Sequence, residues 1–351
     1  MSWFLQASQQ PSITAQHSAV ARQQQLTKPT GSLADLEHVA IQLASLQNTP
    51  HPELSKPWIS IFAADHGVCA ENISAYPQIV TRQMLQNFSN GGACINVIAR
   101  EYAATLTVID CGTVGEAYAY AGVEQRQIRA GTANFAVEAA MTEAECLQAL
   151  ALGRDSVEQA VAQGASIYIA GEMGIGNTCS ASALACMVLD LPADQLTGTG
   201  TGMTATGLSH KTNVIAQAIK LHTAYVQQDA FKALCAVGGL EVAAMTGAYI
   251  RSAQLGLPIL VDGFISTVAA LLAVRINPGV RAWMLFGHQS AEFGHVRLLQ
   301  ILEAQPLLKL NLRLGEGSGA GAALGLIRLA CRIHNEMATF AEAAVEADKV
   351  E

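Results

Sequence analysis

Charged and aromatic side chains are both scarce in this sequence of 351 residues. Charged residues account for 14% of the chain and aromatic residues for 5%, while hydrophobic residues make up 51%. A core with so few aromatic rings must be built mainly from Ala, Val, Leu and Ile side chains. A surface with so few charges suggests that a partner subunit covers part of it. We therefore expect a globular chain that associates with a second subunit.

Clusters of basic residues and long apolar runs are also missing. The formal net charge is −8 and no Lys/Arg cluster interrupts it, which argues against a nucleic-acid partner. The most apolar stretch, residues 259–274, is interrupted by Asp262 and Gly263, which argues against a membrane span. Residues 1–10 lack the basic and apolar parts of a signal peptide. We expect a cytoplasmic protein that binds neither nucleic acid nor membranes.

No two of the eight cysteines form a Cys-x-x-Cys pair. They are scattered through apolar or helical segments, so that reduced, buried thiols are expected rather than disulfides or a zinc site. Asp, His and Glu residues follow several of the expected strands, but no His-x-x-x-His or paired-carboxylate spacing supports a metal. We therefore expect neither a metal nor another cofactor.

Short buried strands alternate with helical patterns along the middle of the chain. Each strand is followed by Asp, Gly or Glu, as is typical where a parallel sheet presents its carboxyl ends. The expected strands are 58–63, 105–110, 166–170, 258–261 and 282–286. Together with 30 glycines, this pattern predicts a doubly wound α/β fold, a Rossmann-like and mostly parallel sheet that is flanked by helices.

Both ends of the chain have helical patterns. Helices are expected at 15–25 and at 33–46, the second with Ser32 as its N-cap. Thr142 and Glu145 form a capping box that opens a further helix. The two ends are expected to build one small helical domain. Its N-terminal part would be 1–57, its C-terminal part 319–351, and the large α/β domain between them 58–318.

A glycine-rich segment, 171–178, directly follows one of these strands. Its glycines let the backbone approach a ligand, Asn177 or Thr178 can cap the next helix, and exposed N–H groups favour a phosphate. The alternative is a tight strand–helix turn without a ligand. The segment is not a Walker A loop, because no Lys follows Gly176, and it does not fit the Gly-x-Gly-x-x-Gly pattern.

Two more glycine-rich segments contain or precede a single charged residue of interest. In 314–321 the glycines frame Glu316, and a carboxylate beside apolar walls is suited to act as a general base with a raised pKa. The alternative is a turn whose glutamate points to solvent. The second segment, 198–202, precedes a helix that starts at 207 and carries Lys211. Lys211 is a candidate for a phosphate or subunit contact, and otherwise the segment is an ordinary flexible loop.

Polar residues also end three strands, in the segments 64–67, 262–263 and 287–292. Their Asp and His residues would lie near the glycine-rich segments if the strands share one sheet. For His66 and His288, hydrogen-bonded structural roles are the more economical interpretation.

Several of these segments, taken together and in order, resemble one family, the nicotinate-nucleotide–dimethylbenzimidazole phosphoribosyltransferases. This family makes the lower-ligand nucleotide of cobalamin-type cofactors. The matching segments span nearly the whole chain, which makes the resemblance specific. They are 28–33, 64–67, 76–81, 171–178, 262–266, 288–292 and 312–319. One departure is Thr30, which stands where the family often has a second proline.

The resemblance implies a Rossmann-like large domain, a small helical domain built from both chain ends, and a homodimer. It also implies roles for individual residues. Glu316 matches the family's general base, and Glu172 matches a second functional glutamate at the nucleotide site. The base pocket would be lined by Tyr76, Met84, Met173 and Leu314. The nucleotide would be bound by Gly174, Gly176, Asn177, Thr178, Lys211 and Asp262.

The implied reaction moves ribose 5-phosphate from nicotinate mononucleotide to 5,6-dimethylbenzimidazole or a related base. The base that the cell uses stays open. Three other functions are weighed against this transferase reaction. An NAD-dependent oxidoreductase would need the Gly-x-Gly-x-x-Gly pattern. A catalytically silent nucleotide-binding protein would not need the complete motif around Glu316. A transferase that uses a ribosyl diphosphate donor would need two adjacent acids after a strand, whereas 261–263 offers only Asp262.

Overall fold

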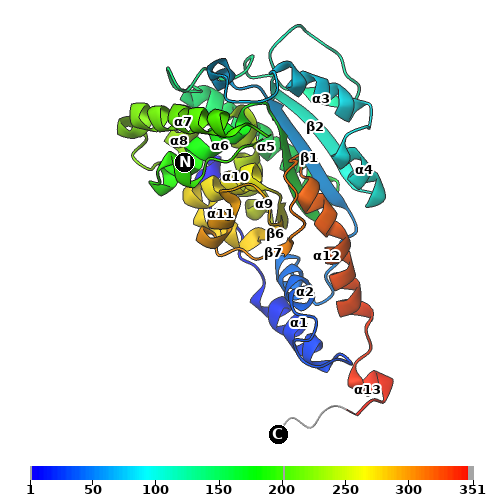
Figure 1. Cartoon of the computed structure of the whole chain (residues 1–351). Coiled ribbons are helices and arrows are strands. Elements are labelled where there is room, and N and C mark those ends of the chain that lie inside the picture. Colours follow the sequence, from blue (N-terminus) through cyan, green and yellow to red (C-terminus); the bar gives the residue numbers. More distant parts are fainter. Residues whose placement is uncertain (1, 201, 347–351) are drawn as a thin grey trace.

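The computed structural model describes residues 2–200 and 202–346 of the chain (Figure 1). Met1 and residues 347–351, at the outer ends of the two segments expected to form a small domain, lie outside the described residues. So does Thr201 in the glycine-rich segment 198–202.

A seven-stranded sheet forms the centre of the molecule, and all of its strand pairings are parallel. The strand order is β3-β2-β1-β4-β5-β6-β7. The strands are β1 (Pro57–Ala64), β2 (Thr105–Gly112), β3 (Val123–Gln125), β4 (Ile167–Met173), β5 (Ile259–Val261), β6 (Met284–His288) and β7 (Pro306–Leu308). This arrangement confirms the predicted α/β fold.

All five predicted strands exist, but two strands were missed. β3 and β7 have three residues each and lie at the two edges of the sheet. So short a strand has no apolar alternation to recognise. β6 begins two residues later than predicted, because Pro278–Trp283 winds into a short 3₁₀ helix before it. Edges and boundaries were therefore the weak points of the prediction.

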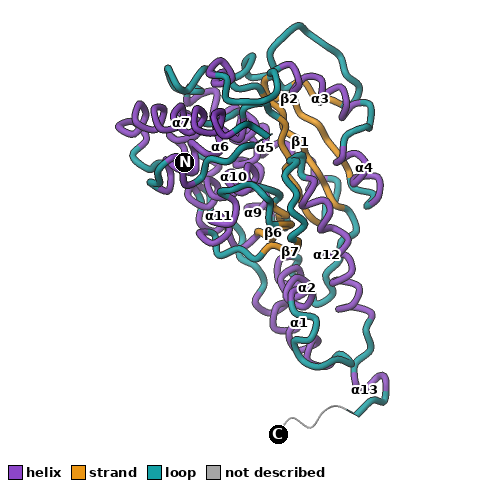
Figure 2. Tube along the Cα trace, in the orientation of Figure 1, coloured by secondary structure: helices purple, strands orange, loops and turns teal. Residues whose placement is uncertain are grey.

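The helices lie on both faces of the sheet (Figures 1 and 2). The long ones are α1 (Ile13–Gln25), α2 (Asp35–Leu46), α3 (Ile79–Ser89), α4 (Cys94–Glu101), α5 (Glu143–Ala162), α6 (Asn177–Leu189), α7 (Ala205–Val226), α8 (Ala230–Val237), α9 (Leu240–Leu255), α10 (Phe264–Ile276) and α12 (Ser318–Glu336). Two short helices are α11 (His295–Ile301) and α13 (Phe340–Ala343). α3, α4 and α12 contact the strands and cover one face, and α9 and α10 cover the other.

Helices α5 and α9 pack closely because each presents a glycine at the crossing. A Cβ at Gly153 would lie only 1.8 Å from the carbonyl oxygen of Ala244, and a Cβ at Gly247 only 2.1 Å from that of Leu150. Neither helix could carry a side chain there without moving away from the other. Close packing of helices at small residues thus fills a core that has few aromatic side chains.

Helix α2 begins later than predicted, and Ser32 does not cap it. The N-cap position is Ala34, which has a φ of 44°, while the N–H of Ser32 donates to Pro29 inside the preceding turn. That turn is held by Lys28, whose Nζ lies 2.7 Å from Oε1 of Glu37 in a buried ion pair. The ion pair therefore overrides the local capping preference of Ser32. The Thr142–Glu145 capping box at the start of α5 is confirmed.

The helices near the two chain ends contact each other at the foot of the molecule. α2 contacts both α1 and α12, and α12 runs from the sheet down to them (Figure 1). Arg22 on α1 joins the two ends, because its guanidinium donates to the carbonyls of His334 (2.6 Å) and Asn335 (2.8 Å) at the end of α12. The domain boundaries at 57/58 and 318/319 stay a prediction.

Among the described residues, no helix has the length and apolar character that crossing a membrane requires. The eight cysteines are free thiols, and six of them are buried. Within residues 2–200 and 202–346, no cluster of three or more His, Cys, Asp and Glu side chains is arranged to bind a metal ion.

Replacing Arg22 by Ala should lower the free energy of unfolding by about 2 kcal/mol, because the last carbonyls of α12 lose their charged donor. Thermal and urea denaturation measure the change. The control is Arg332→Ala, which removes an exposed arginine of α12 whose one ion pair within the described part of the chain is with Glu336. Its effect should be small. Equal losses in the two variants would contradict a special role for Arg22.

Candidate active site

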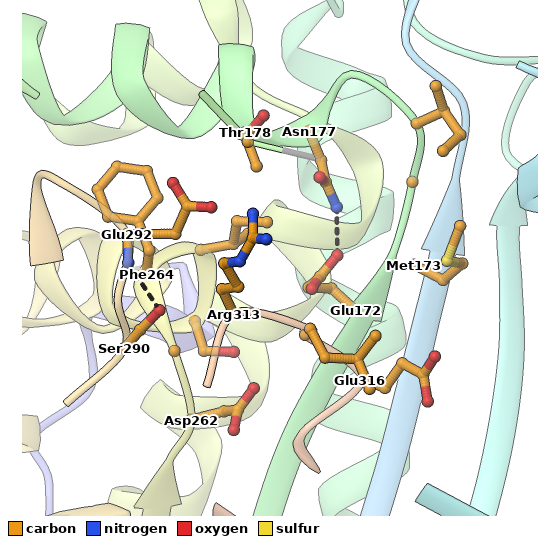
Figure 3. Close-up of a pocket in the computed structure, with 18 of the residues that line it drawn as sticks. Glu172, Met173, Asn177, Thr178, Asp262, Phe264, Ser290, Glu292, Arg313 and Glu316 are labelled. Carbon is orange, nitrogen blue, oxygen red and sulfur yellow. Dashed lines mark hydrogen bonds between the residues drawn. The ribbon is translucent and has the colours of Figure 1, made fainter. Parts of the chain in front are cut away.

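A cavity of about 360 Å³ opens at the carboxyl ends of the central strands. The chain reverses its direction across the sheet between β1 and β4, so that the loops after these strands diverge and leave a crevice. The loops after β4, β5, β6 and β7 and one face of α3 line this cavity (Figure 3). Most of the predicted site residues therefore meet in one place, although they come from distant parts of the chain.

Glu172, near the end of β4, lies at the centre of the cavity (Figure 3). It is buried, and its carboxylate accepts a hydrogen bond from Nδ2 of Asn177. Burial, followed by the charges of Glu241, Asp262 and Glu316, raises the pKa of Glu172 to about 8. Glu172 therefore keeps its proton at neutral pH.

Neither Asn177 nor Thr178 caps the next helix, so this prediction was wrong. Gly176 occupies the N-cap of α6, with a φ of 95° that favours glycine. Asn177 is instead the first residue of the helix and turns its amide back onto Glu172. Thr178 accepts a hydrogen bond from Nζ of Lys211 at 2.8 Å.

Glu316 lies in the loop between β7 and α12, in a strained backbone conformation. Its φ of 62° is left-handed, and the flanking Gly315 and Gly317 are left-handed as well. Its side chain is buried, and Oε2 lies 3.4 Å from the backbone nitrogen of Ile95 in the first turn of α4. The alternative of a turn with a solvent-facing glutamate is therefore wrong. Burial raises the pKa of Glu316, while the N–H of Ile95 opposes that rise.

The loop that carries Glu316 lies directly on the end of β4. A Cβ at Gly171 would be 2.6 Å from the carbonyl carbon of Glu316, and a Cβ at Gly315 would collide with Oε1 of Glu172. At Gly171 the obstacle to a side chain is backbone, and at Gly315 the φ of 95° also favours glycine. The two glycine-rich segments thus bring both glutamates to the same cavity.

Asp262, which follows β5, lines the cavity but already has a structural partner. Its Oδ1 accepts the N–H of Ala320 in the first turn of α12 at 2.8 Å and lies 3.6 Å from Nε2 of His288. Burial raises the pKa of Asp262, and His288 opposes this. Asp262 therefore anchors the helix that starts just after Glu316.

His66 is paired in a similar way beneath the cavity. Its Nε2 lies 2.7 Å from Oε1 of Glu241, and both side chains are fully buried. Neither His66 nor Glu241 lines the cavity. The pair is the hydrogen-bonded, structural arrangement that we expected for His66.

Apolar side chains line the part of the cavity nearest to α3. Val80 and Met84 lie one turn apart on α3, with Met173 at the end of β4. Tyr76 and Leu314 complete this wall, and because they are 52% and 59% exposed they lie at its mouth. All four residues predicted for the base pocket are thus on one wall.

Two cations lie near the cavity, and sequence reasoning singled out only one of them. Lys211 on α7 is buried behind the wall, where its Nζ donates to Thr178 and to the carbonyl of Gly198. Neither Lys211 nor Gly176 lines the cavity. Arg313 does line it, beside Glu292 and Ser290 (Figure 3). The only signal for Arg313 was its place in the same motif as Glu316.

Comparisons with known proteins agree over nearly the whole chain. Residues 8–345 match the profile of a family described as phosphoribosyltransferase. A nicotinate-nucleotide–dimethylbenzimidazole phosphoribosyltransferase of Pseudomonas savastanoi pv. phaseolicola is 57% identical over 344 residues, which are 98% of each chain. The protein of the same name from Pseudomonas fluorescens SBW25 is 56% identical over 98% of this chain and 97% of its own.

Solved structures are similar as well. The crystal structure of CobT from Thermus thermophilus superposes with a TM-score of 0.91 at 44% identity, covering 95% of this chain and 99% of that one. A second structure from the same organism, of a nicotinate-nucleotide–dimethylbenzimidazole phosphoribosyltransferase, has a TM-score of 0.90 at 43% identity. It covers 96% of this chain and 99% of its own. Sequence motifs, fold and full-length similarity therefore agree, and the chain belongs to the nicotinate-nucleotide–dimethylbenzimidazole phosphoribosyltransferase family.

Proposed function

We propose that this protein transfers ribose 5-phosphate from nicotinate mononucleotide to 5,6-dimethylbenzimidazole or a related base, giving α-ribazole 5′-phosphate and nicotinate. The observation that carries this proposal is the pair of glutamates, Glu172 and Glu316, which both line one cavity. An apolar wall adjoins them on one side and Arg313 on the other.

The donor needs little help to lose its base. In nicotinate mononucleotide the leaving ring is a pyridinium, which departs as a neutral ring without taking up a proton. The incoming benzimidazole bonds to the anomeric carbon through one nitrogen and loses a proton from the other. One well-placed carboxylate can therefore carry the acid–base chemistry.

Glu316 is the residue suited to take that proton. Its carboxylate must be ionised, and the N–H of Ile95 at the start of α4 favours the ionised form. Glu172 favours it too as long as Glu172 keeps its proton, since a neutral neighbour does not repel a second charge. We assign general-base catalysis to Glu316 and hydrogen bonding to the nucleotide to Glu172.

The two ends of the cavity suit the two substrates. The apolar wall of Tyr76, Met84, Met173 and Leu314 offers flat, uncharged surface for the incoming base. At the opposite end, the backbone around Gly174 and Asn177, with Thr178 and Arg313, offers polar groups and positive charge for the ribose phosphate. Lys211 holds Thr178 from behind this wall, and Gly176 forms the N-cap of the helix that follows. Asp262 contributes to the site by fixing the start of α12, just after Glu316. Holding the two rings on opposite faces of the ribose makes the displacement invert β to α.

We also propose that the protein is a homodimer. Tyr76 and Leu314 expose large apolar surfaces at the mouth of the cavity, and a second subunit would cover them. Sedimentation velocity measures the oligomeric state. The cytoplasmic location stays a prediction.

The activity is tested by incubating the protein with nicotinate mononucleotide and 5,6-dimethylbenzimidazole and measuring the released nicotinate and the mass of the product. A competition assay with other benzimidazoles, adenine and phenols identifies the preferred base. If no base tested releases nicotinate, the proposed activity is wrong.

Glu316→Gln should lower kcat by about 10² to 10⁴-fold while nicotinate mononucleotide still binds, since only the proton acceptor is lost. Steady-state kinetics and calorimetric binding measure the two quantities. Glu101→Gln, at the exposed end of α4, is the matched control and should leave kcat unchanged. Turnover close to wild type in Glu316→Gln would remove this residue from the role of general base.

Glu172→Gln should stabilise the protein more at high pH than at low pH. The folded protein keeps the proton of Glu172 up to pH about 8, whereas the unfolded chain loses it near the ordinary pKa of 4.5. Between these values the folded state binds the extra proton, so the free energy of unfolding falls as pH rises. Glutamine carries no titrating proton, so the free energy of unfolding of the variant does not fall in this way. Scanning fluorimetry from pH 6 to pH 9 should show a growing difference in Tm between variant and wild type, and a constant difference would contradict the raised pKa.

A further inference from the structure

One buried histidine beside the cavity has no part in the mechanism described so far. His295 is the first residue of α11, is fully buried and does not line the cavity. Its Nδ1 lies 2.8 Å from the backbone nitrogen of Ser290, and its Nε2 lies 2.9 Å from Oγ1 of Thr267 on α10. Both ring nitrogens are therefore used, and one of them contacts a residue of the cavity wall.

The bond to Ser290 determines the form of the ring. A backbone N–H can only donate, so Nδ1 must be unprotonated and must accept. The imidazole is then neutral, carries its proton on Nε2, and donates to Thr267. Burial, together with the nearby His288, lowers the pKa of His295 to about 3, in agreement with this assignment.

The same bond holds the loop of residues 289–292. With its N–H taken by His295, Ser290 uses its hydroxyl to accept the N–H of Glu292 at 3.2 Å and to donate to the carbonyl of Leu312 at 3.1 Å. The N–H of Ala291 donates to the same carbonyl at 2.9 Å. These bonds join the loop to the segment that continues into Arg313.

Figure 3 shows what this connection positions. Ser290, Glu292 and Arg313 lie at the same end of the cavity, with the hydrogen bond between Ser290 and Glu292 drawn. If the N–H of Ser290 lost its acceptor, this peptide would have to turn toward another one, because a buried N–H without a partner is unfavourable. The Ser290 hydroxyl and the Leu312 carbonyl would then move with it.

We propose that His295 is a positioning residue which, as the neutral tautomer protonated on Nε2, fixes loop 289–292 and the adjoining Arg313 for binding of the nucleotide. This inference rests on the proposed function, since Arg313 and the loop belong to the end of the cavity assigned to ribose 5-phosphate. We therefore expect substitutions of His295 to change nucleotide affinity and to have little effect on the chemical step.

Two substitutions at His295 separate positioning from simple stability. His295→Asn places an amide oxygen near the position of Nδ1 and keeps an acceptor for the N–H of Ser290, but it loses the hydrogen bond to Thr267. His295→Gln reaches toward Thr267 and leaves Ser290 without an acceptor. Each variant loses one of two buried hydrogen bonds, so we expect similar decreases in Tm.

Their kinetics should differ. In His295→Gln the KM for nicotinate mononucleotide should rise about tenfold, while kcat should change less than about threefold. In His295→Asn both KM and kcat should stay within about threefold of wild type. Calorimetric titration with nicotinate mononucleotide should show the same order of affinities. Equal KM values in the two variants, or a loss confined to kcat, would overturn the proposal.

A second measurement does not depend on activity. In ¹⁵N-histidine NMR of the wild-type protein, Nδ1 of His295 should resonate as an unprotonated nitrogen throughout the range from pH 5 to pH 8. The spectrum of Thr267→Val assigns the signal, because it removes only the partner of Nε2. A protonated Nδ1 would overturn the proposal even if both His295 variants failed to fold. Absence of nicotinate release by the wild type would instead refute the proposed function and leave this measurement standing.

Discussion

The site depends on one close contact between two pieces of backbone. The loop after β7 lies on the end of β4 with no side chain between them at Gly171, where a Cβ would be 2.6 Å from the carbonyl carbon of Glu316. A methyl group at Gly171 would therefore separate the two segments, whereas one at Gly315 would meet the carboxylate of Glu172. The contact brings Glu172 and Glu316, whose backbone is left-handed, to the same cavity.

The scarcity of charge seen in the sequence has a counterpart around the cavity. The buried carboxylates near it each have a compensating partner: Glu241 has His66, Asp262 has His288 and a backbone N–H, and Glu316 has the start of α4. Glu172 accepts a hydrogen bond from the amide of Asn177, but burial and the neighbouring carboxylates raise its pKa to about 8. Because an unpaired buried charge is very unfavourable, hydrogen-bonding and charged partners oppose the rise in pKa that burial causes.

Much of this could be predicted from the sequence, and the reasons are local. A carboxylate framed by glycines is visible in the sequence around Glu316, as is the turn that follows β4. The cap at Ser32 could not be judged, because the ion pair of Lys28 with Glu37 decides where α2 begins. His295 carries no local signal, and Arg313 has only its place in the motif of Glu316. The connection between them arises only when the loops after β6 and β7 meet, which is a property of the folded sheet.

Helix α12 connects the catalytic loop to the opposite end of the molecule. It starts two residues after Glu316 and, with 19 residues at about 1.5 Å each, extends roughly 28 Å to the carbonyls that Arg22 binds. Its upper end is fastened by Asp262 and its lower end by α1. Because the helix is fastened at both ends, a tilt imposed at the foot would be passed on to Glu316 at the top. The terminal helices, far from the cavity, would thereby help to determine where the carboxylate that we propose as the proton acceptor points.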